Sequence, residues 1–202
     1  MAARAGWKKG RSGMTDIWRG RLVRLRGLEP EDWETFFTWN LDSDTARMLD
    51  HAWFPTSATR ARRWAEETAT RSVADDSFFF AIEELEGGTV VGSIDPKDCD
   101  RRVGSFSYGV GIIPERRQRG YASEAILLVA RYYFQELRYQ KMNAEVHDDN
   151  VASIALHERL GFTREGTLRR IVYKGGQYHD LLHFGMTAEE FAARYPELAS
   201  GG

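Results

Sequence analysis

The clearest candidate for chemistry in this chain is a basic turn that contains a glycine and leads into a long amphipathic segment. The turn reads Arg117-Gln118-Arg119-Gly120-Tyr121-Ala122-Ser123. The first N–H groups of a helix have no partner inside the helix, and the aligned peptide dipoles favour an anion there. Gly120 lacks a Cβ and would let the backbone approach a phosphate closely, while Arg117 and Arg119 could add charge-assisted hydrogen bonds. The turn therefore predicts a site for a phosphorylated ligand.

Polar residues further along the chain form a second candidate group. Asn150 is a good residue to cap the helix that the pattern predicts at Val151–Arg159, and Gly161 is well placed to end it. Ser153 and His157 are four residues apart, so they lie on the same face of this helix.

These residues must be positioned by the elements around them. Val103–Ile113 is predicted to be a strand that ends at Pro114, because proline has no N–H to donate to a ladder. Tyr121–Arg138 is predicted to be a helix. Its apolar residues recur at helical spacing and form one stripe, made of Ile126, Val129, Ala130, Tyr133 and Leu137. We expect this stripe to face the core.

The rest of the chain alternates between strand and helix patterns. Further strands are predicted at Arg21–Arg26, Ser77–Leu85, Thr89–Ile94, Met142–His147, Phe162–Gly166, Leu168–Tyr173 and Gln177–Met186. Helices are predicted after Glu29-Pro30, over Ala58–Ser72 and after a capping box at Thr187. Asp95–Arg102 is predicted to be a charged loop. This order predicts one α/β (α+β) domain, residues 14–197, around a mixed, mostly antiparallel central sheet flanked by helices. Residues 1–13 are expected to be a disordered lead or a tag remnant.

The composition is that of an ordinary globular protein. The chain has 202 residues, of which 42% are hydrophobic and 29% charged, and a formal net charge of −2. Without a basic excess we expect no nucleic-acid partner, and without an apolar run of roughly 20 residues we expect no membrane partner.

The chain has one cysteine, Cys99. An internal disulfide and a cysteine-rich zinc site are therefore excluded, which fits a cytoplasmic location, and we expect no bound metal. The neighbouring Asp98 and Asp100 would raise the pKa of the Cys99 thiol, which argues against a catalytic cysteine.

At the basic turn the chain resembles the GCN5-related N-acetyltransferase (GNAT) superfamily. The family pattern Gln/Arg-x-x-Gly-x-Gly/Ala is matched by Arg117, Gly120 and Ala122. The nearer resemblance is to the ribosomal-protein-alanine N-acetyltransferase (RimJ/RimL type) and spermidine acetyltransferase branches. It is carried by Arg24-Leu25-Arg26, Gly92-Ser93-Ile94, Asp149-Asn150-x-x-Ser153-Ile154, Leu160-Gly161-Phe162-x-x-Glu165-Gly166 and Gly176-Gln177-Tyr178-x-Asp180. These pieces occur in the family's order over nearly the whole domain.

The resemblance implies an enzyme that transfers an acetyl group from acetyl-CoA to a primary amine. It implies a GNAT fold in which two neighbouring strands splay apart and receive the pantetheine arm. The arm is expected to pair with the backbone of Gly111, Ile112 and Ile113. The pyrophosphate is expected on the N–H groups of Gln118, Arg119, Gly120, Tyr121, Ala122 and Ser123. Asn150 resembles the asparagine that steadies the arm, with a plain helix cap as the alternative. The branch contains many homodimers, which leaves a homodimeric state open.

The resemblance assigns the general acid more readily than the general base. Ser153 matches the acid of the ribosomal-protein branch, and His157 stands where many superfamily members carry a tyrosine acid. The two acidic residues that the branch supplies are replaced here by Ser107 and Val172. The candidates that remain for the base are Glu145, His147, Asp180 or a chain of water molecules.

The missing acids bear on the amine that accepts the acetyl group. An α-amino group has a pKa of about 7.7–8.0 and a lysine-like amine about 10.4, so the α-amine is more often neutral at pH 7. We therefore expect a protein N-terminal α-amine or a small amine, with polyamines and aminoglycosides as alternatives. The aromatic and acidic segment Trp39–Phe54, with Asp42, Asp44 and Asp50, is expected on the acceptor side.

Two other hypotheses belong to different functional classes. A catalytically idle acyl-CoA-binding sensor is motivated by the two missing acids. A nucleotide-binding domain would require Gly-x-Gly-x-x-Gly or Gly-x-x-x-x-Gly-Lys-Ser/Thr after a strand, and the sequence contains neither pattern.

Overall fold

The computed structural model describes residues 16–49, 52, 54–73 and 75–199. The lead predicted at residues 1–13 lies outside this range. Within the described ranges, no helix has both the length and the apolar character needed to cross a lipid bilayer.

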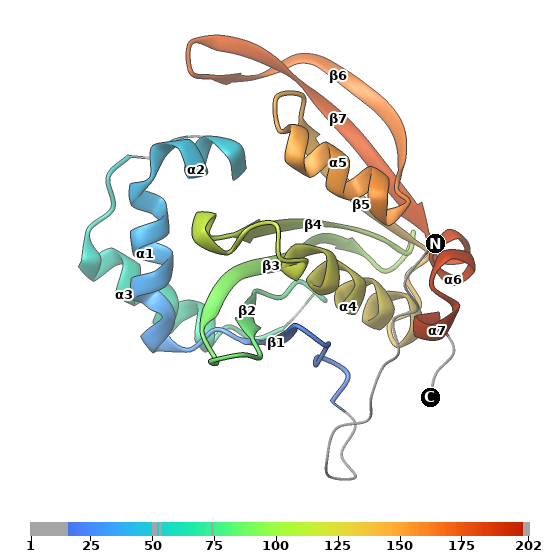
Figure 1. The fold of residues 1–202 in the computed structure, drawn as a ribbon, viewed down its shortest axis with the longest axis horizontal. Coiled ribbons are helices and arrows are strands. Elements are labelled where there is room, and N and C mark those ends of the chain that lie inside the picture. The colour runs from blue at the N-terminus through green and yellow to red at the C-terminus, as the bar shows by residue number, and fades with distance from the viewer. Residues whose placement is uncertain (1–15, 50–51, 53, 74, 200–202) are drawn as a thin grey trace.

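A sheet of seven strands runs through the described part of the molecule in the order β1-β2-β3-β4-β5-β7-β6 (Figure 1). The strands are β1 (Val23–Gly27), β2 (Phe80–Glu84), β3 (Val90–Asp100), β4 (Ser105–Ile112), β5 (Lys141–His147), β6 (Thr163–Lys174) and β7 (Gln177–Thr187). Only β4 and β5 pair in parallel, and the other neighbours are antiparallel. The prediction of a mixed, mostly antiparallel sheet is confirmed.

The helices cover both faces of this sheet (Figure 1). They are α1 (Trp33–Leu41), α2 (Ser43–Leu49), α3 (Ala58–Ala69), α4 (Tyr121–Gln135), α5 (Val151–Leu160), α6 (Ala188–Arg194) and α7 (Pro196–Ala199), with short 3-10 turns at Pro30–Asp32 and Pro114–Arg116. The larger core lies between the sheet and α4, α5 and α6, and includes Ile126, Val129, Ala130 and Tyr133 of the predicted stripe. A smaller core between the sheet and α1 and α3 contains Phe36, Trp39 and Ala65.

Side chains on β2 show how one strand serves both cores. Phe80 and Ile82 belong to the larger core, whereas Ala81 between them belongs to the smaller one. This follows from the two-residue period of a strand, which sends successive side chains to opposite faces. The sheet therefore separates two sides of the molecule, and any site that uses both must pass through it.

Strands β4 and β5 pair over a short stretch and then separate. Ser105, Phe106 and Ser107 pair with Lys141, Met142 and Asn143. Beyond this point β4 continues to pair with β3 as far as Ile112, and β5 continues to pair with β7 as far as His147. The Asn143 side chain donates to the Phe106 carbonyl at 3.2 Å, where the two strands begin to separate. The splayed pair of strands predicted from the resemblance is therefore present.

The structure differs from the predicted elements at three places. The charged loop at Asp95–Arg102 is wrong for most of its length, because β3 continues to Asp100 and carries Asp95 in the sheet. The two strands predicted at Phe162–Gly166 and Leu168–Tyr173 are one strand, β6, with two register shifts. Helix α2 was not predicted. The C-terminal half of β3 contains charged residues and Pro96, which are typical of a loop. The register shifts in β6 interrupt its pattern in the way that a turn would.

Glu124 in the first turn of α4 fixes the start of β1. Its carboxylate accepts from the backbone N–H groups of Arg21 at 2.8 Å, Leu22 at 2.7 Å and Val23 at 2.8 Å. Hydrogen bonds to a charged acceptor are the stronger kind. The N-terminal segment is thereby held beside the turn that precedes α4.

Replacing Glu124 tests this tether. Glu124→Ala is expected to lower the free energy of unfolding by about 2 kcal/mol, because backbone donors lose a charged acceptor. Glu136→Ala, at the exposed C-terminal end of the same helix, is the control and is expected to change it by less than about 0.5 kcal/mol. Urea denaturation measures both, and equal midpoints for the two variants would contradict the tether.

Candidate functional site

The predicted phosphate turn connects the end of β4 to the start of α4. Gly120 is the N-cap of α4 with a φ of 87°, and Gln118 also has a positive φ of 61°. Glycine adopts this left-handed conformation without steric cost. Gly120 offers no side chain to cap the helix, so the N–H groups of Tyr121, Ala122 and Ser123 receive no side-chain cap. The turn thus presents a set of backbone donors at the positive end of a helix dipole.

A buried carboxylate holds this turn in place. Glu84 at the end of β2 is only 4% exposed. It accepts from the Tyr121 hydroxyl at 2.9 Å and forms an ion pair with Arg116 at 3.3 Å. The Tyr121 side chain therefore has a structural role, while its backbone N–H lies at the first position of α4. Both ends of the turn are fixed before any ligand arrives.

The two arginines of the motif differ in their surroundings. Arg117 donates from Nε to the Ile112 carbonyl at 3.0 Å and from Nη2 to the Thr45 hydroxyl of α2 at 3.2 Å. Its guanidinium therefore joins the end of β4 to α2. Gln118 and Arg119 are exposed within the turn. Of the two arginines, Arg119 is better placed to meet an anion arriving from solvent.

The backbone of β4 exposes polar groups where the strand leaves β5. The N–H of Ile113 donates to the Val91 carbonyl at 2.9 Å, so it faces β3. Because the direction of these groups alternates along a strand, the N–H groups of Val110 and Ile112 face the opening toward β5. Gly111 lies between them and approaches β3 closely. A Cβ on Gly92 would come within 2.1 Å of the Gly111 carbonyl oxygen, so position 92 must remain glycine.

Helix α5 borders the other side of the opening. Asn150 caps it by accepting from the Ser153 N–H at 3.1 Å. The Ser153 hydroxyl lies 3.4 Å from His157 Nδ1, and that nitrogen donates to the Ser153 carbonyl at 2.7 Å. His157 Nε2 lies 2.7 Å from the Tyr108 hydroxyl on β4. The predicted pair on α5 therefore extends to a tyrosine that the sequence did not single out.

Burial fixes the protonation of this group. His157 is 2% exposed, and desolvation lowers the pKa of its imidazole below the usual value. Burial raises the pKa of the Tyr108 phenol well above its usual value. The neutral histidine therefore carries its proton on Nδ1 and accepts from Tyr108 through Nε2. Both ring nitrogens are engaged within the protein, whereas the Ser153 hydroxyl is only partly buried.

The opposite face of β3 and β4 borders a pocket of about 730 Å³. Its aromatic walls come from α1, α3 and nearby segments, namely Phe36, Phe37, Trp39, Phe54, Trp64 and Phe79. Its polar lining consists of Asn40, Thr56, Arg60, Ser93, Asp95 and Lys97, and Gly109, Val110 and Gly111 of β4 and Ala61 of α3 complete it. Volume and lining are typical of a small-molecule site.

Comparison with known proteins identifies the family. The family model described as an acetyltransferase (GNAT) domain matches residues 22–163. The chain belongs to the GNAT acetyltransferase family. It is 42% identical over 174 residues to the SPbeta prophage-derived uncharacterized N-acetyltransferase YokL of Bacillus subtilis, covering 86% of this chain and 94% of that protein.

Two solved structures share the GNAT fold. Spermidine N-acetyltransferase from Vibrio cholerae, in complex with CoA and spermine, superposes with a TM-score of 0.73 at 20% identity, covering 84% of this chain and 98% of that one. RimL, a ribosomal L7/L12 α-N-protein acetyltransferase in complex with coenzyme A, superposes with a TM-score of 0.73 at 16% identity, covering 85% and 97%. The resemblance to the GNAT superfamily drawn from the motifs is confirmed.

The acidic residues expected near the acceptor have structural partners where they are described. Asp42 accepts from the Thr45 hydroxyl at 2.5 Å, and Asp44 pairs with Arg47 at 3.0 Å, both within the α2 region. Asp50 lies outside the described residues. Trp39 and Phe54, the ends of the same segment, do line the pocket.

The three residues that remained as candidates for the general base contact other parts of the protein. His147 Nδ1 is 2.9 Å from Lys174 Nζ, and Asp180 accepts from the Arg170 N–H at 2.8 Å. Glu145 is exposed on β5 and lies 3.7 Å from His183. None of the three lines the aromatic pocket. Asp95 does, and sequence reasoning missed it because the residue was placed in a loop.

One group of side chains has the composition of a metal site. Ligand atoms of Asp148, Asp149 and His179 lie within 4.8 Å of one another. Lys174 Nζ lies 2.7 Å from Asp149, and His179 lies 2.9 Å from Asp148, so protein groups already pair with both carboxylates. We assign no metal to this group.

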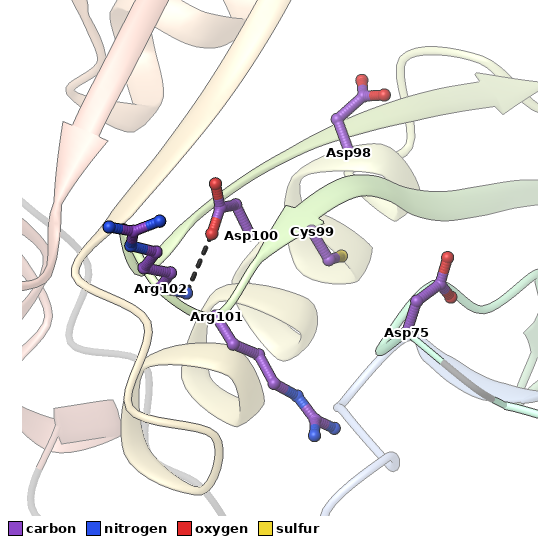
Figure 2. Close-up of a pocket in the computed structure, with 6 residues that line it drawn as sticks. All are labelled: Asp75, Asp98, Cys99, Asp100, Arg101 and Arg102. Atoms are coloured by element: carbon purple, nitrogen blue, oxygen red, sulfur yellow. Dashed lines mark hydrogen bonds between the residues drawn. The ribbon is translucent and has the colours of Figure 1, made fainter.

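A second pocket lies at the β3–β4 turn, at the end of β4 opposite the phosphate turn. It is lined by Asp75, Asp98, Cys99, Asp100, Arg101 and Arg102. Figure 2 shows Asp98 and Asp100 pointing to one side of the strand and Cys99 and Arg101 to the other. Burial, with smaller contributions from Asp76 and Asp75, raises the pKa of the Cys99 thiol. The predicted direction of the pKa shift is confirmed, but its cause is burial rather than the neighbouring Asp98 and Asp100, and the thiol is a poor nucleophile.

Substitution of Gly120 tests the phosphate turn. Gly120→Glu is expected to weaken CoA binding by more than about tenfold, because it places a negative charge where the backbone donors attract an anion. Gly120→Asn is the control, since asparagine tolerates a positive φ and adds no charge. Calorimetry with CoA measures both affinities. If Gly120→Glu binds CoA as tightly as the native protein, the phosphate site lies elsewhere.

Proposed function

We propose that this GNAT protein transfers the acetyl group of acetyl-CoA to a primary amine by direct attack. The observation that carries the proposal is the opening between β4 and β5 after Ser107 and Asn143. On one side of it the phosphate turn offers backbone donors, and on the other lies the aromatic pocket. One extended ligand could therefore reach from an anion site to an acceptor through the sheet.

The residues present fit coenzyme A at three places. The N–H groups of residues 118–123 suit a pyrophosphate, with Arg119 exposed beside them. The backbone of Gly111–Ile113, with Val110 added, suits the amides of a pantetheine arm. The Ile112 carbonyl already accepts from Arg117, so the N–H groups of Val110 and Ile112 are the better partners there. Asn150 caps α5 and is the candidate for steadying the arm.

The chemistry requires a positioned carbonyl and a route for two protons. When bound, acetyl-CoA supplies a thioester carbonyl, and a β4 N–H near Ile112 would polarise it as an oxyanion donor does. The amine nitrogen forms a bond to this carbonyl carbon, and the carbon–sulfur bond breaks with its electron pair on sulfur. The amine loses one proton, and the thiolate gains one.

We assign the acid that protonates the sulfur to Ser153. Its hydroxyl is partly exposed on the face of α5 that also carries His157. His157 is neutral, buried and hydrogen-bonded through both nitrogens, so we assign it a positioning role. The Nδ1–H bond to the Ser153 carbonyl and the contact with Tyr108 would hold the first turns of α5 against β4.

We place the acceptor among protein N-terminal α-amines and small amines. The RimL relative acts on a ribosomal protein and the Vibrio cholerae relative on spermidine, so both classes occur on this fold. The single cysteine supports a reducing, cytoplasmic setting.

A panel of amines tests the proposal. Release of CoA thiol is followed with a thiol-reactive dye, using peptides, polyamines, aminoglycosides and amino acids as acceptors and acetyl-CoA as donor. Turnover with any amine supports the enzyme. If calorimetry shows saturable CoA binding but no amine supports turnover, the protein is an acyl-CoA sensor and not a transferase. Absence of CoA binding would reject both the transferase and the sensor.

Two substitutions on α5 separate the acid from the positioning residue. Ser153→Ala is expected to lower kcat by about 10²-fold with little change in KM and thermal midpoint. His157→Phe is expected to leave kcat within a few-fold but to lower the thermal midpoint, since the buried Tyr108 hydroxyl loses its partner. Steady-state kinetics and thermal denaturation check both, and the opposite pattern would exchange the two roles.

A further inference from the structure

Asp95 is a carboxylate in the wall of the aromatic pocket. It lies on β3 opposite Gly109 of β4 in the ladder, so both face the same side of the sheet. A Cβ on Gly109 would lie 2.9 Å from Asp95 Oδ1, which places the carboxylate directly over the β4 backbone. Gly109 is two residues from Gly111, at the stretch where β4 has left β5. The carboxylate therefore borders the place where an acyl group passing through the opening would emerge.

The Asp95 carboxylate has no partner of its own among the residues that the structure describes. No side-chain hydrogen bond or ion pair reaches it, and Lys97 on the same strand is the charged residue that acts on it electrostatically. Burial raises the pKa of Asp95 to about 6, with a smaller opposing effect of Lys97. A carboxylate held this way is ionised at neutral pH and accepts a proton more readily than an exposed one.

The rest of the pocket limits what can approach this carboxylate. Asp95 is the single carboxylate among the described lining residues. Six of the other lining residues are aromatic, namely Phe36, Phe37, Trp39, Phe54, Trp64 and Phe79. Arg60 and Lys97 line the same space and carry positive charge. A ligand with several ammonium groups would meet these cations with no second carboxylate to offset them.

We propose that Asp95 is the general base of this transferase and that its acceptor is a primary monoamine attached to an apolar or aromatic body. The inference rests on the proposed function and adds to it the missing base and the class of acceptor. The body would be buried against the aromatic walls, and the amine would lie between Asp95 and the thioester carbonyl.

The proposed step balances without a further reactant. The neutral amine nitrogen bonds to the acetyl carbon, the carbon–sulfur bond breaks, and the electron pair leaves with sulfur. The N–H proton goes to Asp95, and the thiolate takes the hydroxyl proton of Ser153, which Ser153 then regains from solvent. The products are the N-acetyl amine and CoA thiol, and Asp95 then loses its proton to solvent.

Replacing Asp95 tests the base. Asp95→Asn is expected to lower kcat by about 10²-fold. In the native enzyme the plot of log kcat/KM against pH is expected to have a slope of 1 below the pKa of an α-amine, about 7.7–8.0, and to steepen below about pH 6 as Asp95 also takes up a proton. In the variant the steeper limb is expected to be absent. Asp98→Asn, on an exposed residue of the same strand, is the matched control and should leave the profile unchanged.

Thermal stability gives a readout independent of activity. The folded protein holds the Asp95 proton up to about pH 6, whereas an ordinary aspartate releases it near 3.8, so this residue makes stability fall as pH rises through that window. Asp95→Asn removes the effect. The variant is therefore expected to melt at a higher temperature than the native protein at pH 7.5 but not at pH 4, so a loss of activity at pH 7.5 would not reflect unfolding.

The acceptor class is tested with matched amines. Phenylalanine amide and glycine amide share an α-amine and differ by one benzyl group, and spermidine supplies the polyamine. The kcat/KM for phenylalanine amide is expected to exceed that for glycine amide by at least about tenfold, because the benzyl group becomes buried. Phe54→Ala is expected to reduce this ratio, and Phe54 is 91% exposed, so the fold should survive its loss.

Each outcome separates the inference from the proposed function. Native turnover with an unchanged kcat and pH profile in Asp95→Asn would overturn the base and leave the transferase intact. A kcat/KM for spermidine equal to or above that for phenylalanine amide would overturn the acceptor class. Absence of turnover with every amine would reject the transferase and the inference together.

Discussion

The constraint on which this structure depends is the early separation of β4 from β5. The two strands share a ladder only between Ser105–Ser107 and Lys141–Asn143. Backbone groups in the middle of a sheet normally find partners, and those left without one in a dry interior cost free energy. The opening therefore persists only if water or a ligand meets these groups. A ligand with amides along its length would satisfy them in the manner of an added strand.

The two-residue period of β4 then divides the site between two faces of the sheet. Tyr108 points to α5 and contacts His157, while Gly109 and Gly111 face the aromatic pocket and Asp95. Neighbouring residues of one strand thus contact α5 on one face of the sheet and the aromatic pocket on the other. The glycines on the pocket side leave space in the pocket that side chains would otherwise fill. Asp95, on the neighbouring strand β3, places a carboxylate beside these glycines.

Carboxylates hold the phosphate turn without occupying its donors. Glu124 stands in the first turn of α4, where acidic residues commonly interact with their own helix end, yet it accepts from residues 21–23. Glu84 accepts a hydrogen bond from Tyr121 and forms an ion pair with Arg116. The N–H groups at the start of α4 are left facing outward. A donor set that is fixed in this way needs little reorganisation on binding an anion.

Local sequence patterns were sufficient to predict several of the elements. The apolar stripe of α4, the glycine of the phosphate turn and the Asn150 cap follow from helix period, φ and capping, and all are properties of short segments. The order of these segments was sufficient to predict the mixed sheet, and the motifs were sufficient to predict the family. Asp95 could not be found this way, since charges around Pro96 resemble a loop and only pairing with β4 makes the segment a strand.

Which polar side chains meet depends on how distant segments pack together. Ser153 and His157 share a helix face, but the burial of His157 and its bond to Tyr108 depend on β4, far away in the chain. Arg117 matches a cofactor motif, yet it turns toward Ile112 and Thr45 because α2 lies beside the end of β4. Local sequence fixes backbone conformation through sterics and capping, whereas protonation and contact depend on long-range burial and charge.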